Sequence, residues 1–423
     1  MRIAFLSTND NLGGAATVTL RLIEGLRELG EDAYMVCARH SLGDEVGYVH
    51  PVSRHRWLSA FLRERLIIYL RNGLSRKQLF KVSTAATGCR VDEMEKLKSA
   101  DVIVLNWINQ GLVSLQDIDR LCSLGKPVVW IMHDLWCATG ICHLPGECRR
   151  YEGECGCCPL LGHGGSHSRY RHDLSHRVWM QKRSLYDRHP NLRFVAVSRW
   201  QHEVCLQSGL LRQRDMHVLP HAFPIDDYSV SPTAEQLGEL QSMGIDTDCR
   251  VIVMAAARLD DPVKDLPMAV ESLNRLAEKH PEVAAGCQAV FVGSLRDPSL
   301  LSSLGMAHVA TGPLTQSQLR ALYSAATAVI STSDYETMGA TLMEGIASGA
   351  TAVTFGNGGQ RDIVRHGHNG YIARYKDADD FAACLGTTLT TPMDRSLQHA
   401  DIAARFSAST IATRFLNILA APN

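Results

Sequence analysis

Short apolar runs alternate with amphipathic segments along the first half of the chain. Each run is apolar at every position, as strands buried on both faces of a parallel sheet require. The strands predicted in this way span residues 3–6, 33–38, 102–105, 128–132 and 194–197. A helix is predicted between the first two strands, where apolar residues recur at helical spacing from Val18 to Leu29 before Gly30. Strands that alternate with helices indicate a doubly wound α/β domain.

A second series of the same kind begins near residue 251. Its predicted strands span residues 251–254, 289–292, 328–330 and 352–354, with helical patterns at 268–279 and 316–325. We therefore predict two Rossmann-like domains, residues 1–215 and 216–399, and a last helix over residues 400–423. Because open parallel sheets bind ligands at the carboxyl ends of their strands, we expect the two domains to face a central cleft.

Composition and charge argue against several classes of protein. The formal net charge of −1 over 423 residues argues against a nucleic-acid-binding protein that works through overall charge. The first apolar run is too short for a signal peptide, and no run of about 20 apolar residues predicts a transmembrane helix. We therefore expect a cytoplasmic protein, in which the 13 cysteines are reduced thiols or metal ligands.

The strongest chemical signal is the segment at residues 336–344, which follows a predicted strand and opens a helix. The helix is predicted to start at Gly339, Ala340 and Thr341. Unpaired backbone N–H groups and the helix dipole favour a phosphate at such a start. Glu336 precedes the helix, whereas Glu344 lies about one turn inside it, where a carboxylate can accept hydrogen bonds from a ribose diol. The alternative interpretation is a capped surface helix with incidental acids.

A basic loop follows the first strand of the second series. The strand at 251–257 runs directly into Arg258, and Lys264 follows on the same loop. Two cations at the carboxyl end of a strand can neutralise the charge that develops on a departing diphosphate. Such a pair usually means a solvated surface, but its position in the second sheet favours a site.

The ordered set of these segments resembles the retaining glycosyltransferases of family 4, which have the GT-B fold. The matches run through almost the whole chain, at residues 13–14, 197–200, 219–221, 258–264, 311–312, 336–344 and 358–370. The resemblance implies transfer of a sugar, with retained anomeric configuration, from a UDP- or GDP-sugar to a glycan or lipid-linked acceptor. It also implies surface polysaccharide synthesis and catalysis without a divalent metal.

Residue roles in the second domain follow from the same resemblance. Glu344 would bind the ribose of the donor, and Glu336 would contact the transferred sugar near its reacting face. Arg258 and Lys264 would bind the diphosphate. The helix start at 339–341 would add backbone N–H groups to the same diphosphate.

The first domain would contribute three further residues. Gly13 and Gly14 would let the backbone approach the diphosphate, and His133 would lie beside the donor sugar. The alternative role of His133 is that of a core histidine. The sequence departs from the family pattern at Asp265, Met338 and His221, where glycine, an aromatic residue and asparagine are frequent.

Cysteines gather in an insert at about residues 137–160 of the first domain. The predicted metal ligands are Cys142, Cys148, Cys155 and Cys158, with Cys137, Cys157 and His143 as substitutes. Four thiolates suit a structural tetrahedral zinc and leave no open position for a catalytic water. Because the insert has little apolar content, a zinc would order it. A reduced, unliganded cluster or a disulfide is the alternative.

Basic and apolar residues interleave from residue 54 to residue 81. Eight arginines and lysines stand against the single acid Glu64 in this segment. The pattern predicts a basic amphipathic helix that lies on an anionic membrane surface, which would make the protein peripheral on the inner face of the membrane. The alternative is a solvated helix that packs its apolar side on the first domain.

Other functions stay open on the sequence alone. A nucleotide-sugar epimerase or a phosphorylase would keep the two-domain fold, and a phosphorylase would need a lysine for pyridoxal phosphate. A non-catalytic nucleotide-sugar-binding subunit is a third interpretation. An epimerase would convert the free donor without an acceptor, and a phosphorylase would show the absorbance of its cofactor. A non-catalytic subunit would bind the donor without turnover.

Overall fold

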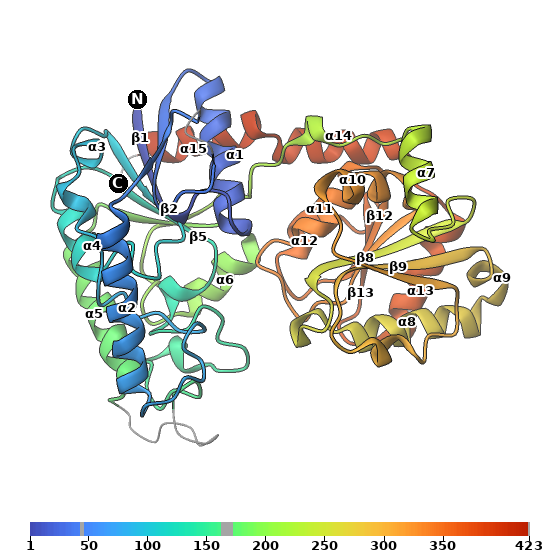
Figure 1. Cartoon of the computed structure of the whole chain (residues 1–423), viewed down its shortest axis with the longest axis horizontal. Helices are drawn as coiled ribbons and strands as arrows, with labels where there is room; N and C mark the ends of the chain where they lie inside the picture. The colour runs from blue at the N-terminus through green and yellow to red at the C-terminus, as the bar shows by residue number, and fades with distance from the viewer. Residues whose placement is uncertain (43–45, 162–171, 422–423) are drawn as a thin grey trace. The chain divides into compact units, whose positions relative to one another are not determined.

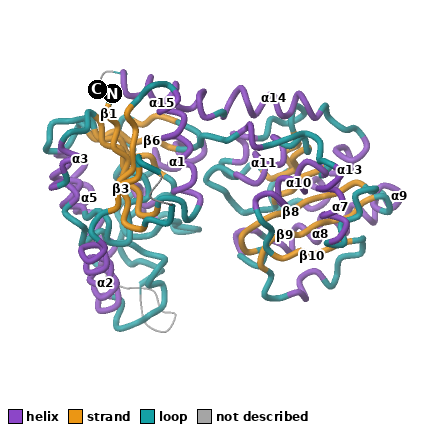
Figure 2. Tube along the Cα trace, turned by 45° about the horizontal axis from the view of Figure 1, so that its top comes forward, coloured by secondary structure: helices purple, strands orange, loops and turns teal. Residues whose placement is uncertain are grey.

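The computed structural model describes residues 1–42, 46–161 and 172–421 of the chain. It divides into two compact units (Figure 1). Unit 1 comprises Met1–Ala222 and Ala408–Asn423, and unit 2 comprises Phe223–Ser407. Each unit has one parallel sheet with helices beside it (Figure 2). The prediction of two parallel-sheet α/β domains is confirmed.

The sheet of unit 1 has seven strands in the order β3-β2-β1-β4-β5-β6-β7. The strands are β1 (Arg2–Asn9), β2 (Asp32–Arg39), β3 (Val49–Pro51), β4 (Val102–Leu105), β5 (Val128–Met132), β6 (Leu192–Ala196) and β7 (Met216–Val218). The chain runs outward from β1 through β2 to β3, and then returns to the other side of β1 at β4. The strand order therefore reverses between β1 and β4, and open sheets bind ligands at the carboxyl ends of such strands.

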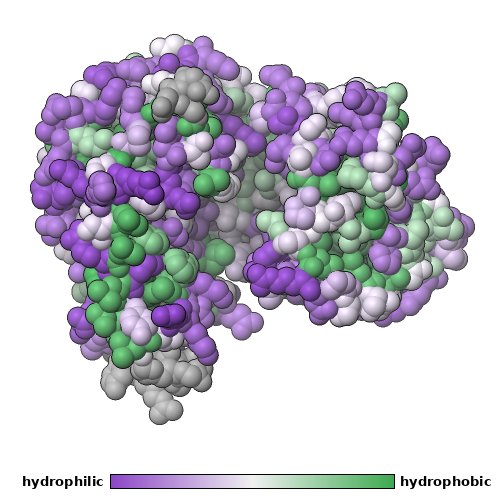
Figure 3. Space-filling model, viewed as in Figure 1, coloured by the Kyte–Doolittle hydropathy of each residue, from purple (hydrophilic) through white to green (hydrophobic). Residues whose placement is uncertain are grey.

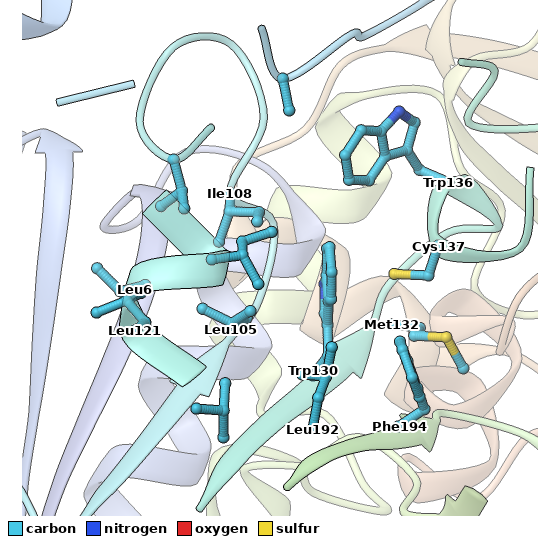
Figure 4. Packing of buried hydrophobic residues seen from close by; sticks show 14 of the residues in the cluster. Leu6, Leu105, Ile108, Leu121, Trp130, Met132, Trp136, Cys137, Leu192 and Phe194 are labelled. Carbon is cyan, nitrogen blue, oxygen red and sulfur yellow. The ribbon is translucent and has the colours of Figure 1, made fainter. Parts of the chain in front are cut away.

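The helices of unit 1 pack on both faces of this sheet. They are α1 (Gly14–Glu28), α2 (Arg54–Arg71), α3 (Glu95–Lys98), α4 (Leu115–Cys122), α5 (Leu174–Arg188), α6 (Arg199–Gln207) and α15 (Ala408–Ala420). Phe5 of β1 faces the core with α1 and α15, whereas its neighbour Leu6 faces the core with α4 and α5. In the second core, Trp130 stacks against Phe194 with ring centroids 6.1 Å apart (Figure 4). Because both faces are buried, the strands are apolar at successive positions.

Unit 2 repeats the architecture with six strands in the order β10-β9-β8-β11-β12-β13. The strands are β8 (Arg250–Arg258), β9 (Cys287–Ser294), β10 (His308–Gly312), β11 (Ala328–Ser331), β12 (Thr351–Phe355) and β13 (Gly370–Ala373). The helices are α7 (Ala234–Ser242), α8 (Leu266–Lys279), α9 (Pro281–Ala284), α10 (Gln316–Ala325), α11 (Ala340–Ala347), α12 (Gln360–Ile363), α13 (Ala378–Thr390) and α14 (Arg395–Phe406). Here the strand order reverses between β8 and β11.

The division between the units differs from the predicted one. The structure divides the chain after Ala222 rather than after residue 215. The intervening strand β7 belongs to the first sheet, since its Met216 pairs with Phe194 of β6. A strand of three residues gives too weak a pattern for the sequence to assign it to one sheet.

Two helices replace the single last helix predicted over 400–423. Ser407 separates α14, which belongs to unit 2, from α15, which belongs to unit 1. The α15 residue Phe415 is fully buried against Phe5, with ring centroids 6.0 Å apart. A Cβ atom at Gly25 of α1 would lie 2.7 Å from the carbonyl oxygen of Ala408, so glycine permits the close approach of the two helices. Within the described residues, no helix combines the length and apolar character needed to cross a bilayer.

Candidate functional site

In unit 2 the predicted site residues gather where the strand order reverses. Arg258 is the last residue of β8, and Lys264 lies on the loop that follows it. Glu336 lies on the loop that follows β11, the strand paired with β8. The carboxyl ends of paired parallel strands meet at one edge of the sheet, so both loops belong to one region.

Lys264 and Glu336 form a direct ion pair between these two loops. Their side chains are only 28% and 24% exposed. The hydroxyl of Ser333 donates to the same Glu336 oxygen at 3.0 Å. The hydroxyl of Thr332 lies 3.0 Å from the carbonyl oxygens of both Lys264 and Asp265. These contacts join the two loops and hold the ammonium group in place.

The guanidinium group of Arg258 is less constrained. Its side chain is 46% exposed, and Nε donates to Asp260 at 3.3 Å. An exposed guanidinium keeps donors available for a bidentate contact with a phosphate. Arg258 therefore supplies a more exposed cation at the start of the loop that carries Lys264.

The start of α11 follows Glu336 closely along the chain. Gly339 caps the helix with φ 97°, a left-handed conformation that favours glycine. No acidic residue occupies the first turn of this described helix, so its N-terminal N–H groups, including those of Ala340 and Thr341, face no local carboxylate. Glu344 lies in the next turn beside Tyr323, and burial together with the Glu344 charge raises the pKa of Tyr323. This arrangement presents a positive helix end followed by a carboxylate.

Two glycines after β12 fix the backbone of the Glu336 loop. The N–H of Gly359 donates to the carbonyl oxygen of Glu336 at 2.7 Å. A Cβ atom at Gly358 would lie 2.7 Å from the backbone nitrogen of Glu336, and one at Gly359 would lie 2.1 Å from the carbonyl oxygen of Thr337. The Gly-Gly pair at 358–359 therefore serves close packing that positions Glu336.

The departure at Asp265 has a conformational explanation. Asp265 adopts φ 49°, the left-handed region in which glycine is favoured. The aspartate offsets the strain, since its side chain accepts from the N–H of Met268 and forms an ion pair with Lys376. Lys376 also lies 2.5 Å from Asp334. Although burial lowers the pKa of Lys376, its hydrogen bonds to the two carboxylates raise it above the usual value. Nothing in the sequence pattern indicates this network.

Gly13 and Gly14 lie at the equivalent edge of unit 1. Gly13 follows β1 and caps α1 with φ 91° and ψ 157°, a conformation available almost only to glycine. A Cβ atom at either glycine would meet no atom of the described residues within 4 Å. The start of α1 is therefore open to a ligand.

His133 follows β5 and is oriented by Asn106, which follows β4. Its Nε2 atom lies 3.1 Å from Oδ1 of Asn106, which also accepts from the Thr19 hydroxyl at 3.1 Å. Because an amide oxygen only accepts, Nε2 of His133 carries the proton. Nδ1 is then an acceptor, and it is buried with no hydrogen-bond partner among the described residues. A ligand hydroxyl that donates to Nδ1 would satisfy it.

His221 stacks on His133 with ring centroids 5.5 Å apart. Burial lowers the pKa of His133 to about 4 and that of His221 to about 3, so both rings are neutral at pH 7. Within the described chain, four more buried side-chain atoms lack a partner at this edge; they belong to Asn9, Asn106, Asn109 and His221. The sequence analysis missed the asparagines, although Asn106 directly follows an apolar strand. Unpaired buried polar atoms are costly, and their grouping indicates a ligand site.

The four predicted metal ligands line one cavity of about 50 Å³; they are Cys142, Cys148, Cys155 and Cys158. No three of them bring their sulfur atoms within 4.8 Å of one another in the described chain. Burial raises the pKa of Cys155 and Cys158 to about 12, so both are thiols without a metal. The N–H of Gly140 donates to the Cys155 sulfur at 3.2 Å, a contact that would favour a thiolate. Zinc binding by this set stays a prediction.

The substitute ligands are less suitable. His143 is committed to Asp134 at 2.6 Å and to the Ser83 hydroxyl at 2.9 Å. Cys137 is buried in the core beside α5 rather than in the cavity. Cys157 neighbours the cavity in sequence but is not among its lining residues.

Among the described residues, one group of three possible metal ligands has its ligand atoms within 4.8 Å of one another. It consists of Asp10, Cys37 and His40. The Asp10 carboxylate already accepts from Ser41 and Leu42 and contacts His40 at 2.8 Å. These hydrogen bonds account for the cluster, because they satisfy the buried Asp10 carboxylate within the protein.

A buried lysine anchors the loop that follows His133. Nζ of Lys182 donates to the carbonyl oxygens of Trp136 and Thr139 at 2.6 and 3.0 Å. It also lies 3.3 Å from the centroid of the Trp136 ring. Burial lowers the pKa of Lys182 to about 7. The sequence offered no signal for this residue, because lysine on a helix is usually exposed.

Comparisons with known proteins found a matching family model and a curated relative. Residues 250–391 match the family model described as glycosyl transferases group 1. The D-inositol 3-phosphate glycosyltransferase of Stackebrandtia nassauensis is 29% identical over 206 residues, which cover 45% of this chain and 46% of that protein. The match thus spans about half the length of this curated relative.

Solved structures match over nearly the whole chain. Anabaena HepE in complex with UDP and glucose has a TM-score of 0.64 at 16% identity, with 100% of both chains covered. Sucrose-phosphate synthase from Thermosynechococcus elongatus has a TM-score of 0.60 at 14% identity, with 99% and 98% covered. A glycosyltransferase from Rickettsia africae has a TM-score of 0.64 at 13% identity, with 99% and 97% covered. The chain has the GT-B fold.

Proposed function

We propose that this chain, which has the GT-B fold, is a glycosyltransferase of group 1 and that it transfers a sugar from a nucleotide-diphosphate donor to an acceptor hydroxyl. The observation that carries the proposal is the Lys264–Glu336 ion pair, which lies just before the N-terminus of α11 at the reversal point of the unit 2 sheet. This region falls within the family match at 250–391. The likeness to HepE, solved with UDP and glucose, supports a nucleotide-sugar donor.

The leaving diphosphate is bound by positive groups of unit 2. Lys264, held by Glu336, and Arg258 face the charge that develops as the glycosidic bond breaks. The N–H groups at the start of α11, Gly339 to Thr341, bind the same diphosphate. Glu344 binds the ribose diol. Lys264, Arg258 and the start of α11 supply the positive charge at the diphosphate, so no divalent metal is needed there.

His133, which belongs to unit 1, contacts the donor sugar. Its neutral ring accepts a hydrogen bond from a sugar hydroxyl at Nδ1, because Asn106 holds the proton on Nε2. Gly13 and Gly14 leave room for the diphosphate at the start of α1.

The transfer proceeds with retention of configuration. The bond from the anomeric carbon to the diphosphate breaks while the acceptor oxygen bonds to that carbon on the same face. The acceptor proton moves to the departing diphosphate oxygen. Glu336 is paired with Lys264, which favours this route over a double displacement with a carboxylate nucleophile. The acceptor is a glycan or a lipid-linked saccharide of surface polysaccharide synthesis.

The test is a mass-spectrometric screen of UDP- and GDP-sugars for binding and turnover, with Glu336→Gln as the diagnostic variant. We expect the variant to bind donor but turn over at least ~100-fold more slowly, as loss of a transition-state contact usually does. Glu278→Gln, an exposed acid on α8, is the matched control. Activity should survive EDTA, and NMR of the product should show the anomeric configuration of the donor.

Three outcomes would replace the proposal. Isomerisation of donor without acceptor would indicate an epimerase. Pyridoxal phosphate absorbance with phosphate-dependent cleavage would indicate a phosphorylase. Donor binding with no turnover of any acceptor would indicate a non-catalytic subunit.

A further inference from the structure

Helix α2 of unit 1 exposes a ridge of leucines. The ridge consists of Leu58, Leu62, Leu66 and Leu70, which are 42%, 56%, 53% and 54% exposed. A spacing of four residues places them along one side of the helix. Leu74 and Phe80, 60% and 62% exposed, continue the apolar surface beyond the helix. Figure 3 shows this apolar surface over α2.

The opposite face of α2 buries charge, which fixes the orientation of the helix. Glu64 is fully buried and Arg65 is 6% exposed, and the two form an ion pair at 3.1 Å. The Glu64 carboxylate also accepts from the N–H groups of Thr84 and Ala85, each at 2.9 Å. Rotating the leucines inward would leave these charged groups unpaired. The same face also packs Ala60 and Ile68 into unit 1, so the alternative holds for part of the apolar residues, whereas the leucine ridge stays outside the domain.

Cations surround the leucine ridge. Those exposed between residues 54 and 81 are Arg54, Arg56, Arg63, Arg71, Arg76, Lys77 and Lys81. The single acid of the segment, Glu64, is buried. Within the described chain, Arg56 alone of these cations has a carboxylate within 4.0 Å, that of Glu93 at 3.4 Å. The surface is thus apolar at its centre and positive around it.

We propose that the leucine ridge of α2 inserts into an anionic lipid bilayer, with the surrounding cations on the headgroups. Amphipathic helices with leucine on one face and arginine beside it bind at the boundary of headgroups and acyl chains. A second copy of the chain fits poorly, because a two-fold pairing of this face would set its cations against each other. The inference deepens the proposed function, since it places a lipid-linked acceptor at the surface that α2 contacts.

The test is flotation of the full chain with vesicles of phosphatidylcholine, alone or mixed with phosphatidylglycerol. We expect binding to the anionic vesicles and its loss at high salt. The combined variant Leu62→Ser, Leu66→Ser and Leu70→Ser should bind ~100-fold more weakly, from about fivefold for each half-buried leucine lost. The matched control is Leu124→Ser, Leu206→Ser and Leu397→Ser, three exposed leucines elsewhere.

A second variant tests the charge. Arg63→Gln, Arg71→Gln and Lys81→Gln together should also weaken binding by ~100-fold at low salt, at about fivefold for each cation. Failure of the chain to bind anionic vesicles, or equal binding by the leucine variant and its control, would overturn the inference. So would a dimer in sedimentation that the leucine variant abolishes. Turnover of donor with a short water-soluble acceptor should be unchanged in the leucine variant, so a failed membrane test leaves the proposed transferase untouched.

Discussion

The two sheets of this protein reverse their strand order in the same way but build opposite chemistry at that point. Unit 2 places formal charges there, and they pair with one another, as in Lys264 with Glu336. Unit 1 places neutral groups there, with buried atoms of His133, His221 and Asn106 that lack partners in the described residues. Under the proposed function, the strand-order reversal sets where the ligand binds, and the side chains set which part of the ligand binds there.

The difference follows from what each part of a nucleotide sugar needs. A diphosphate needs positive charge that survives in the absence of ligand, and a carboxylate such as Glu336 can hold a lysine ready for it. A sugar hydroxyl needs acceptors and donors of fixed direction, which neutral rings and amides supply. Among the described residues, the neutral groups of unit 1 include buried atoms without partners, whereas Lys264 and Glu336 of unit 2 satisfy each other.

The largest expected effect concerns the charged site. Lys264→Ala and Arg258→Ala should each lower turnover at least ~100-fold, because each removes positive charge from the departing diphosphate. Steady-state kinetics with the preferred donor is the measurement, and Lys279→Ala, an exposed lysine of α8, is the control. Near wild-type turnover in both variants would remove the leaving-group role from unit 2.

The neutral site predicts a pH dependence of stability. The folded-state pKa values of His133 and His221, about 4 and about 3, lie below the ordinary value of 6.5. The unfolded chain therefore binds more protons below pH 6.5, and stability falls as the pH drops from 6.5 towards 4. At pH 5.5 each histidine should cost on the order of 1 kcal/mol relative to pH 8.

Denaturant unfolding at several pH values measures the slope of the free energy of unfolding against pH. His221→Asn should remove the share of one histidine, whereas His368→Asn, an exposed control in unit 2, should leave the slope unchanged. Equal slopes in the wild type and His221→Asn would mean that the ring takes up its proton freely in the folded protein. The contrast between the two sites would then lose its electrostatic basis.

The smallest effect is expected at the cysteine cavity. Elemental analysis should find about one zinc per chain, and chelation should lower the melting temperature by a few degrees, equivalent to ~1 kcal/mol. Cys155→Ser should abolish the zinc, whereas Cys249→Ser in unit 2 should retain it. Metal-free wild-type protein with unchanged melting would contradict the prediction.

Apolar patterning predicted the two sheets well, because buried parallel strands are apolar throughout. The strand expected at 251–257 is β8, and the one expected at 128–132 is β5. The residues at the carboxyl ends of these strands, Arg258 as the last residue of β8 and His133 directly after β5, could be found because parallel topology fixes where strand ends lie.

Tertiary contacts decided what the sequence could not show. In α2, leucines at helical spacing fit either an inward or an outward face, and the buried Glu64 carboxylate with its backbone donors at 84–85 leaves them outward. The stacking of His221 on His133 joins segments far apart in the chain. The left-handed backbone at Asp265 is likewise invisible when an aspartate occupies a position that favours glycine.

The return of the chain to unit 1 at α15 has a consequence for biosynthesis. Phe415 and Ile411 cover the face of the first sheet that holds Phe5. On the ribosome, residues 1–222 emerge long before 408–420, so the part of that face that α15 packs against stays uncovered while the whole of unit 2 is made. Unit 2, whose segments are contiguous, can complete its core first, and the N-terminal domain matures only after translation has passed α15.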